Sequence, residues 1–99
     1  MSKVELKPYE RGCESTVLAD IAAFWMTHYL TVTPEQAKDD LEAWTGARHE
    51  LYVILADGVP AGFLHMGERG GGACDWLEDV FVREELRGRG IGGQAIELA

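Results

Sequence analysis

The segment His49–Ala56 constrains the fold most, because it has the pattern of a strand with apolar side chains on both of its faces. Such a strand belongs inside a sheet that is covered on both sides. The Asp57-Gly58 pair that follows is a hairpin-turn signal, so Pro60–Met66 is predicted to return antiparallel beside it. The chain is therefore predicted to build a layered α/β structure around this pair of strands.

The other elements follow from hydrophobic periodicity and from helix caps. Thr33-Pro34-Glu35-Gln36 combines an N-cap, a proline at the first helical position and a Gln three residues after the cap, which predicts a helix from Pro34 to Thr45. The remaining predictions are a strand at Lys3–Tyr9, a helix at Ser15–Leu30, a fourth strand at Ala73–Val82 and a short helix from Gly90. We expect one α/β domain, residues 1–99, with a mixed, mainly antiparallel sheet and flanking helices.

Charge excludes one class of partner. Among the 99 residues, nine Lys and Arg stand against 17 Asp and Glu, for a formal net charge of −8. Nucleic-acid binding depends on clustered basic residues, so we expect none. An acidic surface suits a cationic partner such as an amine or polyamine, and equally serves solubility alone.

Several further classes are excluded by what the sequence does not contain. No apolar run approaches the roughly 20 residues that span a bilayer, and residues 1–7 lack the apolar stretch of a signal peptide, so we expect a cytoplasmic protein without membrane contact. Cys13 and Cys74 match no metal or redox spacing, which indicates two reduced thiols. His49 and His65 have no second ligand at metal spacing, so no metal is expected.

The segment from Arg87 to Gly93 indicates a site for an anion. It places four glycines and two arginines between a predicted strand and a predicted helix. Glycines leave backbone N–H groups uncovered, and together with the positive end of the helix dipole these groups suit a phosphate or pyrophosphate. Arg87 and Arg89 add positive charge there.

These glycines also fit other motifs in part. Gly88-Arg89-Gly90-Ile91-Gly92-Gly93 matches G-x-G-x-x-G, but the dinucleotide fingerprint needs a further strand with an acidic residue about 20 positions on, and this sequence has six residues after Gly93. The nucleotide P-loop needs a Lys-Ser or Lys-Thr pair, which is absent here. A plain tight turn is the remaining alternative, and it does not explain the two arginines.

Arg87-Gly88-Arg89-Gly90-Ile91-Gly92 resembles the R-x-x-G-x-G signature of the GCN5-related N-acetyltransferase superfamily, and Trp76–Val82 is similar to that family's fourth strand. The Leu77-Glu78-Asp79 pattern looks most like the diamine and polyamine acetyltransferases. The resemblance implies an enzyme that moves an acetyl group from acetyl-CoA, its cosubstrate, to a primary amine of a small molecule. It further implies that the turn, residues Arg87, Gly88, Arg89, Gly90, Ile91 and Gly92, holds the pyrophosphate of coenzyme A, and that the main chains of Phe81 and Val82 pair with its pantetheine arm.

The acceptor amine must lose a proton before it attacks, because an amine with a pKa near 10 is mostly protonated at pH 7. Glu78 is the candidate catalytic base, since strand alternation places it with Trp76, Val80 and Val82 and turns Asp79 to the other face. An ion-pairing or substrate-orienting carboxylate is the alternative role, and His65 is an alternative base.

Two aromatic residues near the end of the first predicted helix are candidates for the acceptor pocket. The resemblance implies that the loop after this helix lines that pocket, which makes Trp25 and Tyr29 substrate-binding candidates. Packing in the core is the alternative for both residues.

The sequence departs from the family's pattern after its glycine turn. Family members continue with a fifth strand, a fourth helix and a final pair of strands, and this sequence encodes none of them. We expect either a C-terminally truncated domain, the front part of a longer enzyme, or a homodimer that completes the sheet. A coenzyme A binding or regulatory module, or an inactive fragment, is the alternative to an enzyme.

Overall fold

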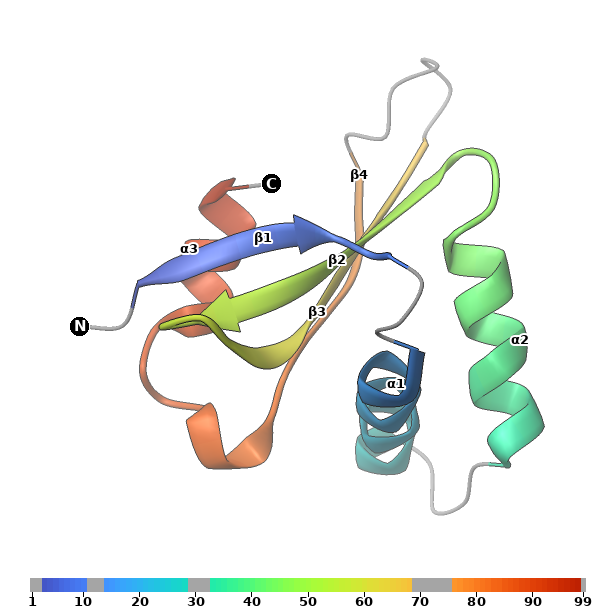
Figure 1. Cartoon of the computed structure of the whole chain (residues 1–99), viewed down its shortest axis with the longest axis horizontal. Coiled ribbons are helices and arrows are strands. Elements are labelled where there is room, and N and C mark those ends of the chain that lie inside the picture. The colour runs from blue at the N-terminus through green and yellow to red at the C-terminus, as the bar shows by residue number, and fades with distance from the viewer. Residues whose placement is uncertain (1–2, 11–13, 29–32, 69–75, 99) are drawn as a thin grey trace.

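The computed structural model describes residues 3–10, 14–28, 33–68 and 76–98. Over these residues the chain forms one antiparallel sheet of four strands in the order β1-β2-β3-β4, with three α-helices packed around it (Figure 1). The elements are β1 (Val4–Pro8), α1 (Glu14–His28), α2 (Pro34–Trp44), β2 (His49–Ala56), β3 (Val59–Gly67), β4 (Trp76–Val82), the 3₁₀ turn η1 (Glu84–Leu86) and α3 (Ile91–Leu98). The predicted α/β class and the order of its elements are confirmed.

The predicted hairpin forms the centre of this sheet. β2 pairs antiparallel with β3 on one side and with β1 on the other. Asp57 and Gly58 both have positive φ, 53° and 80°, as the tight turn between strands of right-handed twist requires. β3 is buried without interruption from Ala61 to Gly67, so the sheet is covered on both faces as the apolar pattern predicted.

The two faces of the sheet carry separate hydrophobic clusters. α1 and α2 cover one face, where Ile21 and Phe24 pack against Phe63 and Phe81. α3 lies on the opposite side (Figure 1), and its Ile91 and Ala95 pack with the second cluster. Fully burying a large apolar side chain contributes about 1.5–3 kcal/mol. Both layers of helices are therefore held to the sheet by apolar burial.

The helix caps follow the sequence closely. The Thr33 hydroxyl oxygen accepts a hydrogen bond from the Gln36 N–H at 3.2 Å, which confirms the predicted N-cap of α2. α1 begins at Glu14, one residue before the prediction, and residues 29–32 lie outside the described part of the chain. None of the described helices has both the length and the apolar character needed to cross a membrane.

Two β-bulges interrupt the regular pairing of β3. Against β2, Ile54 pairs with Gly62 and Leu55 with Pro60, so Ala61 is an extra residue. Against β4, His65 pairs with Asp79 and Met66 with Leu77, so Glu78 is an extra residue of β4. A bulge re-aims the side chains beside it. Each of these two therefore changes which side chains share a face.

An ion pair joins α1 to the end of β4 across 63 residues of sequence. The Arg83 Nε and Nη2 groups donate to the two carboxylate oxygens of Asp20 at 2.9 and 3.3 Å. Asp20 is only 5% exposed, and burial raises the pKa of its carboxyl above the ordinary value of 3.8, against the opposing effect of the Arg83 hydrogen bond. The pair fixes the backbone direction where the chain leaves the sheet.

We expect Asp20→Asn to change how stability depends on pH. Folded Asp20 holds its proton more tightly than the unfolded chain does, so its contribution to the free energy of unfolding is complete below pH 3.8 and is lost as pH rises through the folded pKa. Urea unfolding of both proteins should be measured from below pH 3.8 to above the folded pKa of Asp20. The free energy of unfolding of the wild type, minus that of the variant, should fall as pH rises. A difference that stays constant with pH would contradict this assignment.

Candidate functional site

The glycine-rich segment forms an exposed turn between β4 and α3. Gly88 and Gly90 have φ of +82° and +75°, a region that other residues enter only with strain of roughly 1–2 kcal/mol. The Gln94 N–H donates to the Gly90 carbonyl, which makes this the first bond of the helix. The N–H groups of residues 91–93 therefore have no helical acceptor and remain available at the positive end of α3.

Arg87 is held at the border between this turn and β4. Its Nε donates to the Val82 carbonyl at 2.8 Å, and its guanidinium carbon lies 5.4 Å from the centroid of the Phe81 ring. Arg89 is exposed on the turn. The two arginines thus flank the helix end, in an arrangement that suits a phosphate group.

The resemblance implied that the main chains of both Phe81 and Val82 face the outer edge of β4. The structure differs from this expectation at Phe81. The Arg83 N–H donates to the Ala61 carbonyl, and the Phe81 carbonyl lies only 1.8 Å from where a Cβ on Gly62 would be. Phe81 therefore directs its main chain toward β3. Because backbone groups alternate along an antiparallel strand, Val80 and Val82 direct theirs to the outer edge. Phe81 instead contributes its ring to the core, where it is 6% exposed.

A cavity of about 420 Å³ lies between α1 and the end of β4. Its lining combines apolar groups with charges of both signs: Asp20, Ala23, Met26, Phe81, Arg83, Glu84, Glu85 and Arg87. Arg87 is the residue that this lining shares with the glycine-rich segment.

Glu78 lies on a different face from the one that regular alternation predicted. Leu77, Val80 and Val82 all pack with the cluster under α3, because the bulge inserts Glu78 between them. A Cβ on Gly67 would lie 2.8 Å from the Glu78 Oε1 atom, so the Glu78 side chain lies over Gly67, on the face of His65 and Asp79. The expected grouping of Glu78 with Val80 and Val82, opposite Asp79, is wrong. Glu78 is exposed and lies beside polar groups.

A chain of hydrogen bonds crosses three strands on this same face. The Asp79 Oδ2 atom lies 2.9 Å from the His65 Nδ1 atom, and the His65 Nε2 atom lies 2.8 Å from the His49 Nδ1 atom. The Trp44 ring stacks on His65 with centroids 4.6 Å apart. Sequence reasoning took the two histidines one at a time and missed this arrangement. No local signal marks it, because the two histidines share a face only through the bulge at Ala61.

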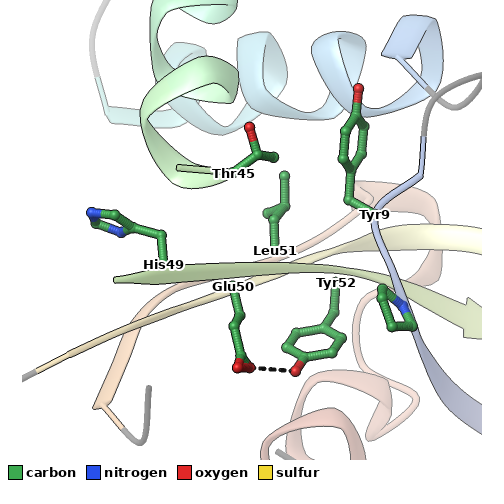
Figure 2. A pocket seen from close by; sticks show the side chains of 7 residues that line it. Tyr9, Thr45, His49, Glu50, Leu51 and Tyr52 are labelled. Carbon is green, nitrogen blue, oxygen red and sulfur yellow. Dashed lines mark hydrogen bonds between the residues drawn. The ribbon is translucent and has the colours of Figure 1, made fainter. Parts of the chain in front are cut away.

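His49 also lines a second cavity, of about 540 Å³, beside the end of β1. Figure 2 shows His49, Thr45, Leu51 and Tyr9 on one side of β2, and Glu50 with Tyr52 on the other. The Tyr52 hydroxyl donates to the Glu50 carboxylate at 2.5 Å. The hydrogen-bonded chain that begins at β4 therefore ends at an open cavity.

Trp25 is not among the residues that line these two cavities. The Trp25 indole N–H donates to the Asp40 carboxylate and so joins α1 to α2, where Trp25 also packs against the core. This favours the core-packing alternative over contact with a substrate. Tyr29, Cys13 and Cys74 lie outside the described residues. Among the residues that the structure describes, no group of three or more His, Cys, Asp or Glu side chains could hold a metal ion.

Comparison with known proteins identifies the fold. Two solved structures are similar to this chain: an acetyltransferase from Thermus thermophilus, with a TM-score of 0.71 at 20% identity, and a glucosamine-6-phosphate N-acetyltransferase from Arabidopsis thaliana, with 0.59 at 19%. Each covers 97% of this chain, which spans 66% and 71% of theirs, about two thirds of their length. No protein of curated function matches the sequence.

The sequence also matches a family model. Residues 18–99, most of the chain, match the model of the Acetyltransferase (GNAT) family. This segment contains the whole hairpin, β4 and the glycine turn. Together with the fold shared with solved acetyltransferases, this match shows that the chain belongs to the acetyltransferase (GNAT) family.

Proposed function

We propose that the protein is an acetyl-CoA-dependent N-acetyltransferase whose acceptor is a primary amine of a small molecule. The observation that carries this proposal is the exposed glycine turn between β4 and α3, with Arg87 bonded to the outer edge of β4. Family membership supports the reaction class. Binding of coenzyme A without turnover is the second candidate, because the chain spans about two thirds of the length of similar acetyltransferases.

The residues present fit coenzyme A as a ligand. The N–H groups at the start of α3, with Arg87 and Arg89, would hold its pyrophosphate, and nothing lies within 4 Å of a Cβ built on Gly88. The outward backbone groups of Val80 and Val82 would pair with the pantetheine arm, although Arg87 already occupies the Val82 carbonyl. When bound, acetyl-CoA supplies a thioester carbon that an unprotonated amine attacks, with the thiolate as the leaving group.

A cationic acceptor suits the charge of the protein. The formal net charge is −8, so the overall field of the protein attracts a cation. We favour a polyamine, since each further amine of such a molecule adds a positive charge. The Leu77-Glu78-Asp79 pattern supports the same acceptor class.

Glu78 is the carboxylate that we assign to the acceptor amine. It is exposed, and it lies on the face that α1 and α2 cover, next to Gly67. An exposed carboxylate there attracts the ammonium form of the acceptor and orients its nitrogen. The bulge places this carboxylate on the same face as Asp79, whose own carboxylate bonds to His65.

Arg87→Glu is expected to weaken acetyl-CoA binding by about tenfold to a hundredfold, because it replaces a phosphate-binding guanidinium with a negative charge. Calorimetric titration of acetyl-CoA into the 99-residue chain measures the effect. Lys38→Glu, on the exposed side of α2, makes the same change in net charge and should leave affinity within about twofold. Unchanged binding by Arg87→Glu would place the coenzyme elsewhere, and no binding by the wild type would contradict the proposed function.

Glu78→Gln is expected to lower turnover more than it lowers coenzyme affinity. The neutral amide keeps the volume of the side chain but no longer attracts the ammonium group, so kcat/KM for the amine should fall by about tenfold or more. Acetyl transfer to a panel of small amines, with polyamines included, measures this change. The dissociation constant for acetyl-CoA should stay within about twofold of the wild-type value, because Glu78 lies away from the glycine turn. Full activity in this variant would remove Glu78 from the mechanism.

We further propose that a strand from a second copy, or from another segment of the family's fold, lies against the outer edge of β4 before Val80 and leaves Val80 and Val82 to the pantetheine arm. No described strand pairs with that edge, and an open edge promotes association. Sedimentation of the 99-residue chain should therefore show a dimer or larger species. A monomer with an ordinary free energy of unfolding, about 5–15 kcal/mol, would contradict the second-copy version.

A further inference from the structure

With the Asp79 carboxylate ionised and both imidazoles neutral, the chain Asp79–His65–His49 has one arrangement of protons in which every member is satisfied. A carboxylate accepts hydrogen bonds and does not donate them, so the His65 Nδ1 atom must carry the proton that bonds to Asp79. A neutral imidazole then has a lone pair at Nε2, which accepts from the His49 Nδ1–H. His49 is left with its own lone pair at Nε2. The proton-accepting end of the chain is therefore that atom.

His65 itself is excluded as the base by its surroundings. Both of its ring nitrogens are engaged, it is 3% exposed, and the Trp44 ring stacks on it. No substrate reaches it there. Its role is to connect His49 to the Asp79 carboxylate, in the way that a buried carboxylate orients and stabilises the imidazole of a catalytic triad. Burial of His65 keeps water from competing for these bonds.

His49 is placed where a substrate proton can reach it. It is half-buried and lines the cavity of about 540 Å³ beside the end of β1 (Figure 2). It is also the cross-strand partner of Gly67, on the same face. Because Gly67 has no side chain, the Glu78 carboxylate occupies the space above it, next to His49. The residue assigned to the acceptor amine and the free end of the chain are therefore neighbours.

We propose that His49 is the catalytic proton acceptor of this protein, that its Nε2 atom takes the proton of the amine directly or through one water, and that His65 and Asp79 are positioning residues. This inference rests on the proposed function. An N–H bond of the ammonium group breaks, its electron pair stays on the amine nitrogen, and a bond forms between that proton and Nε2. His49 becomes an imidazolium, whose charge the Asp79 carboxylate stabilises through His65, and it later releases the proton to solvent. Glu78 then orients the amine and does not keep its proton.

The tautomers can be measured without any activity. Nitrogen-15 NMR of the histidine rings in the full chain should show Nδ1 protonated and Nε2 unprotonated for both His49 and His65 at neutral pH. Asp79→Asn removes the charge that holds this arrangement, so both tautomers should be populated. A protonated Nε2 on His49 in the wild type would overturn the proposal, whatever the enzyme's activity.

The kinetic test compares His49 with a charged residue outside both cavities. His49→Asn keeps an N–H that can donate to His65, but its amide cannot accept the proton of the amine. Turnover should therefore fall by about a hundredfold or more. The increase of turnover rate with pH that is due to His49 should also disappear. Glu42→Gln removes a charge on the exposed side of α2, away from both cavities, and should leave both the turnover rate and its increase with pH unchanged. The titratable and charged groups near His49 are Glu50, His65, Asp79, Glu78, Tyr9 and the Arg48–Glu68 pair.

The outcomes separate this inference from the proposed function. If the wild type turns over and His49→Asn has the same rate and pH profile, the role of His49 is overturned and the proposed function is not. No turnover by the wild type would contradict the proposed function, and the NMR result would then decide the proton arrangement independently. Because His49 lies away from the glycine turn, affinity for acetyl-CoA should stay within about twofold in His49→Asn, which also shows that the variant is folded.

Discussion

The continuous burial of β3 is the constraint on which the rest of the structure depends. Ala61–Gly67 has no exposed residue, because β2 and β4 occupy its two edges and helices cover its two faces. Phe63 and Leu64 are successive and fully buried, yet they belong to different clusters, one under α1 and α2 and the other under α3. The register of a buried strand is fixed, because shifting the strand by one residue exchanges the side chains of its two faces. Each bulge in the pairing of β3 therefore changes which side chains of the neighbouring strands share a face.

The bulge at Ala61 brings the two histidines together. Near the turn, Ala56 pairs with Val59, and continuing that register would place His49 opposite Met66, on the face of α3. The extra residue shifts the pairing so that His49 lies opposite Gly67, on the face of His65. The bulge at Glu78 acts in the same way on β4 and adds a second carboxylate to that face. A polar cluster spanning three strands thus depends on two inserted residues.

Different groups hold the two ends of β4. At the far end, Arg87 and the Asp20–Arg83 pair fix the chain before the glycine turn. At the near end, Asp79 and Glu78 belong to the polar cluster with His49 and His65. The outer backbone of Val80 and Val82 connects these regions. β4 therefore extends from the polar cluster at one end to the glycine turn that follows its other end.

The sequence by itself determined the local features. The Thr33 cap, the Asp57-Gly58 turn, the apolar β2 and the glycine turn before α3 could all be predicted, because each depends on backbone preferences or side-chain periodicity within a few residues. Only the tertiary structure decided which distant groups meet. Asp20 and Arg83 are paired by packing of α1 on the sheet, and regular alternation misplaced Glu78 because nothing local marks a bulge. The position of a bulge depends on how whole strands fit their neighbours, and the free energy that selects it comes from burial on both faces of β3.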